Sequence, residues 1–191
     1  MDAQKKNLKK WIIPAFLVLC LVQLYAPLSL IVTHNAVLTK GKLFRFKVAP
    51  VDPNDPFRGK YITLRYEVNS VKVKNVNEFL GNTKAYVILK TDPHGYAMIE
   101  NISLRRPNSP VDYVEVPAYV INIDDKNIVD VEFPFRRFYM EETKAVRAEK
   151  LFLQTQRNPG VSTVALVYVR NGAAVLEDVL INGESVNKLL K

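Results

Sequence analysis

The sequence predicts a mainly β fold of the α+β class. One N-terminal transmembrane helix precedes an antiparallel β-rich domain, a sandwich or a barrel, with one short amphipathic helix. Two observations support this prediction. A charge-free apolar run of 22 residues extends from Trp11 to Val32. From Ala36 onward, apolar and polar residues mostly alternate with period two, as in half-buried strands. The chain thus divides into a basic tail (1–10), a transmembrane anchor (11–32) and an exported domain (33–191).

The apolar run is long enough to cross a membrane, because 22 helical residues at about 1.5 Å each match the roughly 30 Å hydrocarbon core. Four lysines and one aspartate precede it. Positive flanks stay in the cytoplasm, so the domain is expected on the far side. A cleaved signal peptide and a buried soluble helix are the alternatives. The run exceeds the usual signal-peptide core, however, and no good small-x-small cleavage site follows it.

Period-two segments separated by turn residues predict the strands of the domain. The Asn171-Gly172 pair between two apolar segments predicts a hairpin turn. One stretch, Glu141 to Gln154, instead has apolar residues at helical spacing and opens with two acidic residues, which predicts the short helix. The strands are expected at Leu43–Val48, 61–68, Ala85–Lys90, Tyr96–Leu104, Tyr119–Ile123, Ile128–Phe133, Val164–Arg170 and Ala173–Ile181.

Composition argues against several classes of chemistry. The single cysteine, Cys20, lies in the apolar run, so no disulfide, thiolate nucleophile or cysteine-based metal site is expected in the domain. His34 and His94 are far apart in the sequence. We therefore expect no metal and no cofactor. Beyond residue 32 there are 23 basic and 18 acidic residues without a basic tract, which disfavours nucleic acid as a partner.

The segment DPNDPFRGKYITLRYEV carries the candidate site residues. Asp52 and Asp55 could act as an acid–base pair or bind Ca²⁺. The favoured interpretation is turn chemistry, because Asp before Pro is a common turn opener. A loop that contacts a partner is a third possibility. Arg58 and Arg65 could pair with these aspartates and hold the turn.

The stretch RGKYITLRY resembles the signature of the GDYXXLXY domain family, a bacterial family of membrane-anchored proteins. Gly59, Tyr61, Leu64 and Tyr66 match, whereas Lys60 stands where the family has an acidic residue. FRRFYMEETKAVRAEKL and VYVRNGAAVLEDVLINGESV are similar to later parts of the same family. The resemblance implies a single-pass protein of the bacterial inner membrane whose domain is extracytoplasmic. It also implies a polytopic membrane protein as companion, with no established enzymatic activity.

The residues and the resemblance together predict a non-enzymatic accessory subunit whose exported β domain associates with a polytopic membrane protein. Gln23 and Tyr25 interrupt the anchor and are the candidate contacts with a membrane partner, since an intramembrane glutamine often bonds across a helix interface. The alternative for both residues is a position near the membrane interface. An envelope hydrolase or peptidase with an unrecognised site is the alternative function. A cell-wall ligand module with a groove of Tyr61, Tyr66 and Tyr139 is another.

Overall fold

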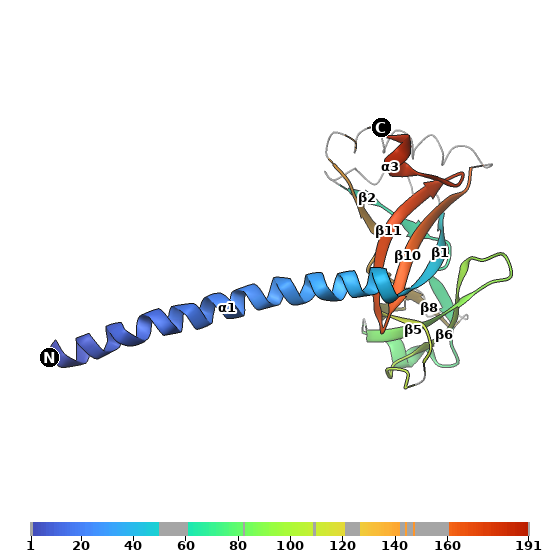
Figure 1. Ribbon diagram of the computed structural model, residues 1–191. Helices are drawn as coiled ribbons and strands as arrows, with labels where there is room; N and C mark the ends of the chain where they lie inside the picture. Colours follow the sequence, from blue (N-terminus) through green and yellow to red (C-terminus); the bar gives the residue numbers. More distant parts are fainter. Residues whose placement is uncertain are drawn as a thin grey trace.

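The structure, a computed structural model, describes residues 2–49, 61–81, 83–108, 110–120, 127–141, 144, 147 and 161–190. The N-terminal element is one long helix, α1 (Asp2–Lys40, 39 residues). Figure 1 shows α1 as a rod that projects from a β-rich body. The part from Ile12 to Lys40 is the one helix among the described residues that is long and apolar enough to cross a membrane. Its apolar side chains are exposed, and Pro14 and Pro27 lie within it.

Helix α1 continues eight residues beyond Val32, so the expectation of period-two structure from Ala36 is wrong for residues 36–40. The reason is tertiary packing. Val37 is buried against the body, and Arg170 donates a hydrogen bond from Nη1 to the Ala36 carbonyl at 3.2 Å. The helix ends at Lys40, and the N–H of the following residue, Gly41, donates to the Val37 carbonyl at 2.8 Å. Strand β1 starts at the next residue, so no linker separates helix from domain.

The body is formed by two five-stranded antiparallel sheets and a two-stranded ribbon, as predicted for a mainly β fold. The first sheet has the order β12 (Glu184–Ser185), β11 (Ala173–Ile181), β10 (Thr163–Arg170), β1 (Lys42–Ala49), β3 (Arg65–Tyr66). The second has the order β4 (Ser70–Lys72), β8 (Ile128–Val131), β7 (Tyr113–Tyr119), β5 (Thr83–Thr91), β6 (Ala97–Ser103). The ribbon pairs β2 (Tyr61–Thr63) with β9 (Arg137–Tyr139), while η1 (Val76–Phe79) and α3 (Val186–Leu189) are single turns.

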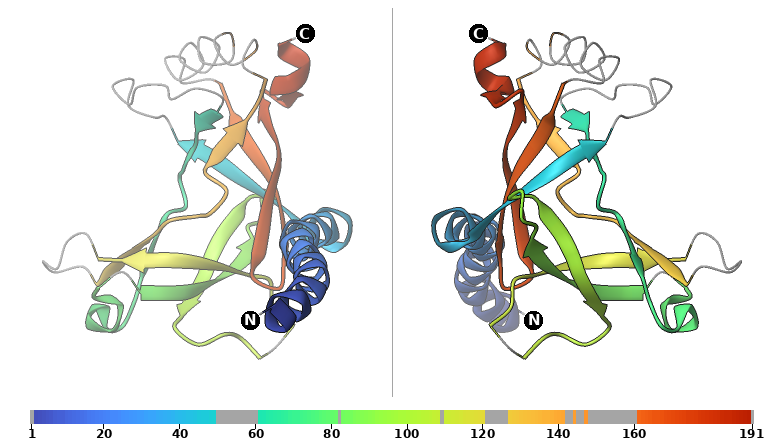
Figure 2. Two further views of the ribbon diagram at one scale, coloured as in Figure 1. Left: turned by 90° about the vertical axis from the view of Figure 1, so that its left-hand side faces the viewer. Right: turned by 90° about the vertical axis from the view of Figure 1, so that its right-hand side faces the viewer.

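One hydrophobic core runs through both sheets. Along β1 the predicted alternation is confirmed, because Phe44, Phe46 and Val48 are buried while Arg45 is exposed. The valine-rich inner faces of β10, β7 and β8 join the same cluster. The two views in Figure 2 show the long β10–β11 hairpin passing beside the second sheet, which curls until its edge strands β4 and β6 approach each other. The second sheet is therefore nearly a barrel.

The β10–β11 hairpin connects the two sheets at its turn. Asn171 and Gly172 both have positive φ, 50° and 89°, as a two-residue Asn-Gly hairpin requires, which confirms the predicted turn. The Gly172 carbonyl accepts a hydrogen bond from Glu115 N–H at 3.0 Å. A Cβ at position 172 would lie 2.7 Å from Cε2 of Tyr113, so this close approach also needs glycine.

Two predictions about the elements need correction or fall outside the structure. The strand predicted at Tyr119–Ile123 has the wrong start, because β7 runs from Tyr113 to Tyr119. Residues 121–126 lie outside the described residues. Pro117 is the reason why the sequence did not predict the first part of this strand. It sits where the β8 pairing ends, so its missing N–H removes no bond from the ladder. The helix predicted from Glu141 to Gln154 lies mostly outside the described residues, although Lys144 and Arg147 are helical.

Candidate functional site

The signature stretch forms β2 and β3, with Leu64 between them. Strand β2 pairs with β9, and β3 pairs with the end of β1, so the stretch crosses from the ribbon to the first sheet. Asp52, Asp55, Arg58 and Gly59 lie outside the described residues. Their predicted roles as turn, acid–base, calcium or contact residues therefore stay predictions. Arg65 is described and exposed.

The inner face of this stretch belongs to the core. Leu64 and Tyr66 are buried, on the opposite face from Tyr61, as expected from strand alternation. The Tyr66 ring packs on Phe46, Phe133 and Phe135 with centroid distances of 5.3, 5.9 and 5.3 Å. Its hydroxyl donates to the Phe135 carbonyl at 2.8 Å. Burial raises the pKa of Tyr66, so its hydroxyl stays protonated and donates this bond. Tyr66 acts as a structural anchor and cannot line a surface groove with Tyr61.

Replacing Tyr66 with phenylalanine should lower the free energy of unfolding by about 1–3 kcal/mol, because the buried Phe135 carbonyl loses its side-chain donor. Denaturant unfolding of the full chain in detergent measures this loss. Tyr61→Phe is the matched control within the same signature, since Tyr61 is only half-buried, and it should change stability by less than about 0.5 kcal/mol. Equal losses for both variants would contradict the anchoring role of the Tyr66 hydroxyl.

The outer face of the ribbon carries an aromatic and cationic cluster. Tyr61 stands opposite Tyr139 in register, with ring centroids 5.5 Å apart. The Arg137 guanidinium lies 5.0 Å from the centre of the Tyr61 ring. A side-chain hydrogen bond with Tyr139 raises the pKa of Arg137, and Tyr61 adds to this effect. Tyr139 is 65% exposed. This cluster, Tyr61–Arg137–Tyr139, places two aromatic rings and one guanidinium together on the outer face of the ribbon.

The sequence pointed to Tyr61 and Tyr139 but missed Arg137. Arg137 could have been found from the sequence, because it lies two residues before Tyr139 along the predicted strand end. Residues two apart on a strand share a face. The described residues contain no group of three or more His, Cys, Asp or Glu side chains that could hold a metal ion.

The two anchor candidates lie on different sides of α1. Residues two apart are rotated by about 200° around a helix, so Gln23 and Tyr25 face nearly opposite directions. Both side chains are exposed. No hydrogen bond joins the Gln23 amide to any other described residue, whereas the Ser29 and Thr33 hydroxyls donate to the Ala26 and Ser29 carbonyls at 2.8 Å. Within the apolar part of α1, Gln23 and Tyr25 are therefore the exposed polar side chains without a hydrogen bond to another described residue.

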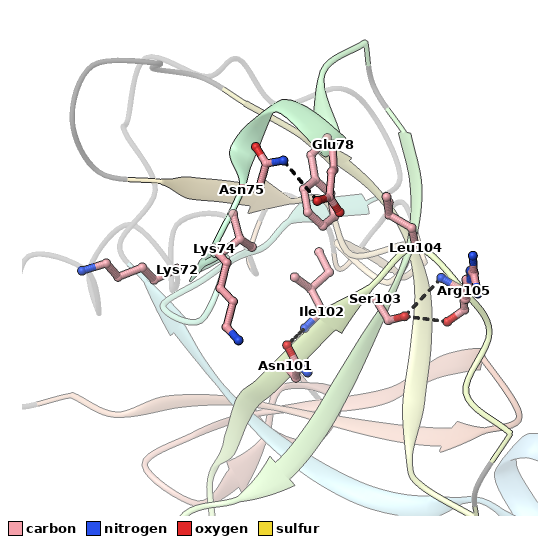
Figure 3. A pocket seen from close by; sticks show the side chains of 11 residues that line it. Lys72, Lys74, Asn75, Glu78, Asn101, Ile102, Ser103, Leu104 and Arg105 are labelled. Atoms are coloured by element: carbon pink, nitrogen blue, oxygen red, sulfur yellow. Dashed lines mark hydrogen bonds between the residues drawn. The ribbon is translucent and has the colours of Figure 1, made fainter.

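A second surface feature was not predicted from the sequence. A groove of about 720 Å³ lies between the ends of β4 and β6, beside η1 (Figure 3). It is called the β4–β6 groove below, and its principal residues are Lys72, Lys74, Glu78, Phe79, Ile102 and Arg105. The sequence could not show it, because β4 has three residues and the two strands are far apart in the chain.

The described structure defines a class: a mainly β domain held without a linker at the end of one long apolar helix. Comparison with known families shows which family the chain belongs to. Residues 23–179 match the family described as GDYXXLXY protein, which covers most of the chain. The chain therefore belongs to the GDYXXLXY family, as its signature stretch predicted. No curated protein and no solved structure matches it.

Proposed function

We propose that this chain is a non-enzymatic accessory subunit of the bacterial inner membrane, which associates through α1 with a polytopic membrane protein. The lysine-rich tail supports a cytoplasmic N-terminus and an extracytoplasmic domain. The observation that carries the proposal is the unsatisfied amide of Gln23 on the exposed surface of α1.

The depth of Gln23 favours a partner contact over a position near the membrane interface. Along the helix axis, Gln23 lies about 18 Å from Trp11 and about 14 Å from Val32, which is close to the middle of the apolar run. An amide at this depth cannot reach water, and leaving it unbonded in hydrocarbon is unfavourable. A neighbouring helix is the available source of a hydrogen bond.

Pro27 enlarges the polar site around Gln23. Proline has no N–H, so the carbonyl four residues earlier, that of Gln23, loses its bond within the helix. Gln23 therefore offers a side-chain amide and a main-chain acceptor at the same place. Helices in membrane bundles satisfy such groups through side chains of their neighbours, each interhelical bond contributing roughly 0.6–2 kcal/mol.

The test is co-purification of the tagged chain from its native membrane in mild detergent. The unaltered chain should carry along one multispanning protein, and Gln23→Leu should reduce the recovered amount several-fold, because the interhelical hydrogen bond is lost. Tyr25→Phe is the matched control, since it removes one polar group from the opposite side of the helix. A chain that migrates alone, with Gln23→Leu changing nothing, argues against the proposal.

A further inference from the structure

We propose that the β4–β6 groove binds an extended acidic peptide segment of a partner protein, which adds as a strand to the free edge of β4. This surface is separate from the Gln23 contact and extends beyond the proposed function. The inference rests on three observations: the direction of the unpaired main-chain groups, the charge of the rim and the apolar floor.

Strand β4 directs unpaired main-chain groups into the groove. It pairs only with β8 among the described strands. The Asn69 carbonyl and the Val73 N–H bond to the β8 side, at 2.9 and 2.8 Å. Because main-chain groups alternate in direction along a strand, those of residues 70 and 72 face away from β8. They form a short row of donors and acceptors at the edge of the groove.

Strand β6 presents a similar edge from the other side. It pairs only with β5 among the described strands, and the β5 register places Asn101 and Ser103 toward β5. The main chain of Ile102 consequently faces outward. Its N–H is bound by the side chain of the preceding residue, Asn101 Oδ1, at 2.8 Å (Figure 3).

The rim of the groove is cationic. Lys72, Lys74 and Arg105 surround it, and the one carboxylate, Glu78, accepts a hydrogen bond from Asn75 Nδ2 at 3.2 Å. None of the three cations forms an ion pair with a described residue. Complementary charge on a partner would steer its approach and favour acidic segments over basic ones.

The floor of the groove is apolar. Phe79 and Ile102 are buried there, with exposures of 4% and 8%, and Val73 packs against the same core. A bound strand alternates its side chains between two directions. A segment in which acidic and β-branched residues alternate would place carboxylates at the rim and apolar groups on the floor. This combination favours a peptide over a lipid or a sulfated glycan, neither of which matches the main-chain edges.

The test uses a fluorescein-labelled peptide of roughly nine alternating glutamate and valine residues, about the length of a long strand. Anisotropy is measured with the full chain in uncharged detergent. Saturable binding is expected, and replacing both Lys72 and Lys74 with glutamate should weaken it by about tenfold or more. The corresponding lysine–valine peptide should not bind.

Two comparisons isolate strand addition from charge. Lys72→Thr removes the cation and keeps the outward N–H, whereas Lys72→Pro removes both and is tolerable on an edge strand. Lys72→Pro should bind at least several-fold more weakly than Lys72→Thr. On the unaltered protein, the same glutamate–valine peptide with alternate amides N-methylated should lose binding, which gives a readout independent of any variant's folding.

The proposal is overturned if the glutamate–valine peptide does not bind, or if the lysine variants bind it as well as the unaltered chain. It is also overturned if N-methylation has no effect, or if dextran sulfate competes as well as the unlabelled peptide. Either of these last results would show that the rim attracts polyanions without strand pairing. The assay contains no membrane partner, so its outcome is independent of the Gln23 experiment.

Discussion

Replacing Phe46 with alanine is expected to lower the free energy of unfolding by about 3–5 kcal/mol, the range for removing a large aromatic side chain from a core. Phe46 is fully buried, and its ring contacts those of Tyr66, Phe133 and Phe135 at centroid distances of 5.3, 5.3 and 5.1 Å. The substitution therefore removes transfer free energy and leaves a cavity at the junction of β1, β3 and the chain before β9. Denaturant unfolding of the full chain in detergent, followed by circular dichroism, measures the effect.

Leu43→Ala provides the matched control for Phe46→Ala. Both residues lie on β1, but Leu43 is on the outer face and 41% exposed. It should cost less than about 1 kcal/mol, because much of its surface is already in water. A loss for Phe46→Ala no larger than that for Leu43→Ala would show that the aromatic cluster does not organise the core.

The second large effect is expected at the junction between α1 and β1. In Gly41→Ala, the added Cβ would lie 2.3 Å from the Val37 carbonyl oxygen and 3.1 Å from that of Val169. Both neighbours are main-chain atoms, so neither can move aside without shifting the helix end or β10. We expect a loss of stability at the upper end of the roughly 1–3 kcal/mol typical of overpacking. Limited proteolysis near residue 41 should also become faster, because the helix end is displaced.

Thr39→Ala is the control at the same junction. Thr39 is exposed, and its hydroxyl bonds only the Asn35 carbonyl within the helix, at 2.8 Å. Its replacement should change stability by less than about 0.5 kcal/mol. If Gly41→Ala behaves like Thr39→Ala, the close packing of the helix end against the hairpin is not a determinant of stability.

Local patterns predicted the β fold where the signals were strong. The alternation in β1 follows from Phe44, Arg45 and Phe46, and the hairpin turn follows from Asn171-Gly172, because these preferences act over a few residues. Helix α1 between Ala36 and Lys40 could not be predicted, because its extension depends on Val37 and on Arg170, which is 134 residues away from Ala36. The start of strand β7 was predicted at Tyr119 and not at Tyr113, because Pro117 discourages a strand unless the end of its neighbour is known.

The candidate site, like the fold, was predicted only in part. Tyr61, Leu64 and Tyr66 were recognised from the family signature, and strand alternation placed them on the correct faces. The sequence could not show that Tyr66 donates to Phe135, because that contact depends on how the chain returns from β8 to β9. The β4–β6 groove depends on the curl of a whole sheet, which no short pattern encodes.

With no linker between α1 and β1, rotation of the domain about its helix would break the packing of Val37 and the hydrogen bond from Arg170 to Ala36. Eight helical residues beyond Val32 hold the domain about 12 Å from the end of the apolar run. The number of these residues also sets the orientation of the domain around the helix axis. If α1 binds a partner through Gln23 as proposed, the side of the domain that faces this partner is tied to the side of α1 on which Gln23 lies. Adding or removing one helical residue between them would turn the whole domain by about 100°.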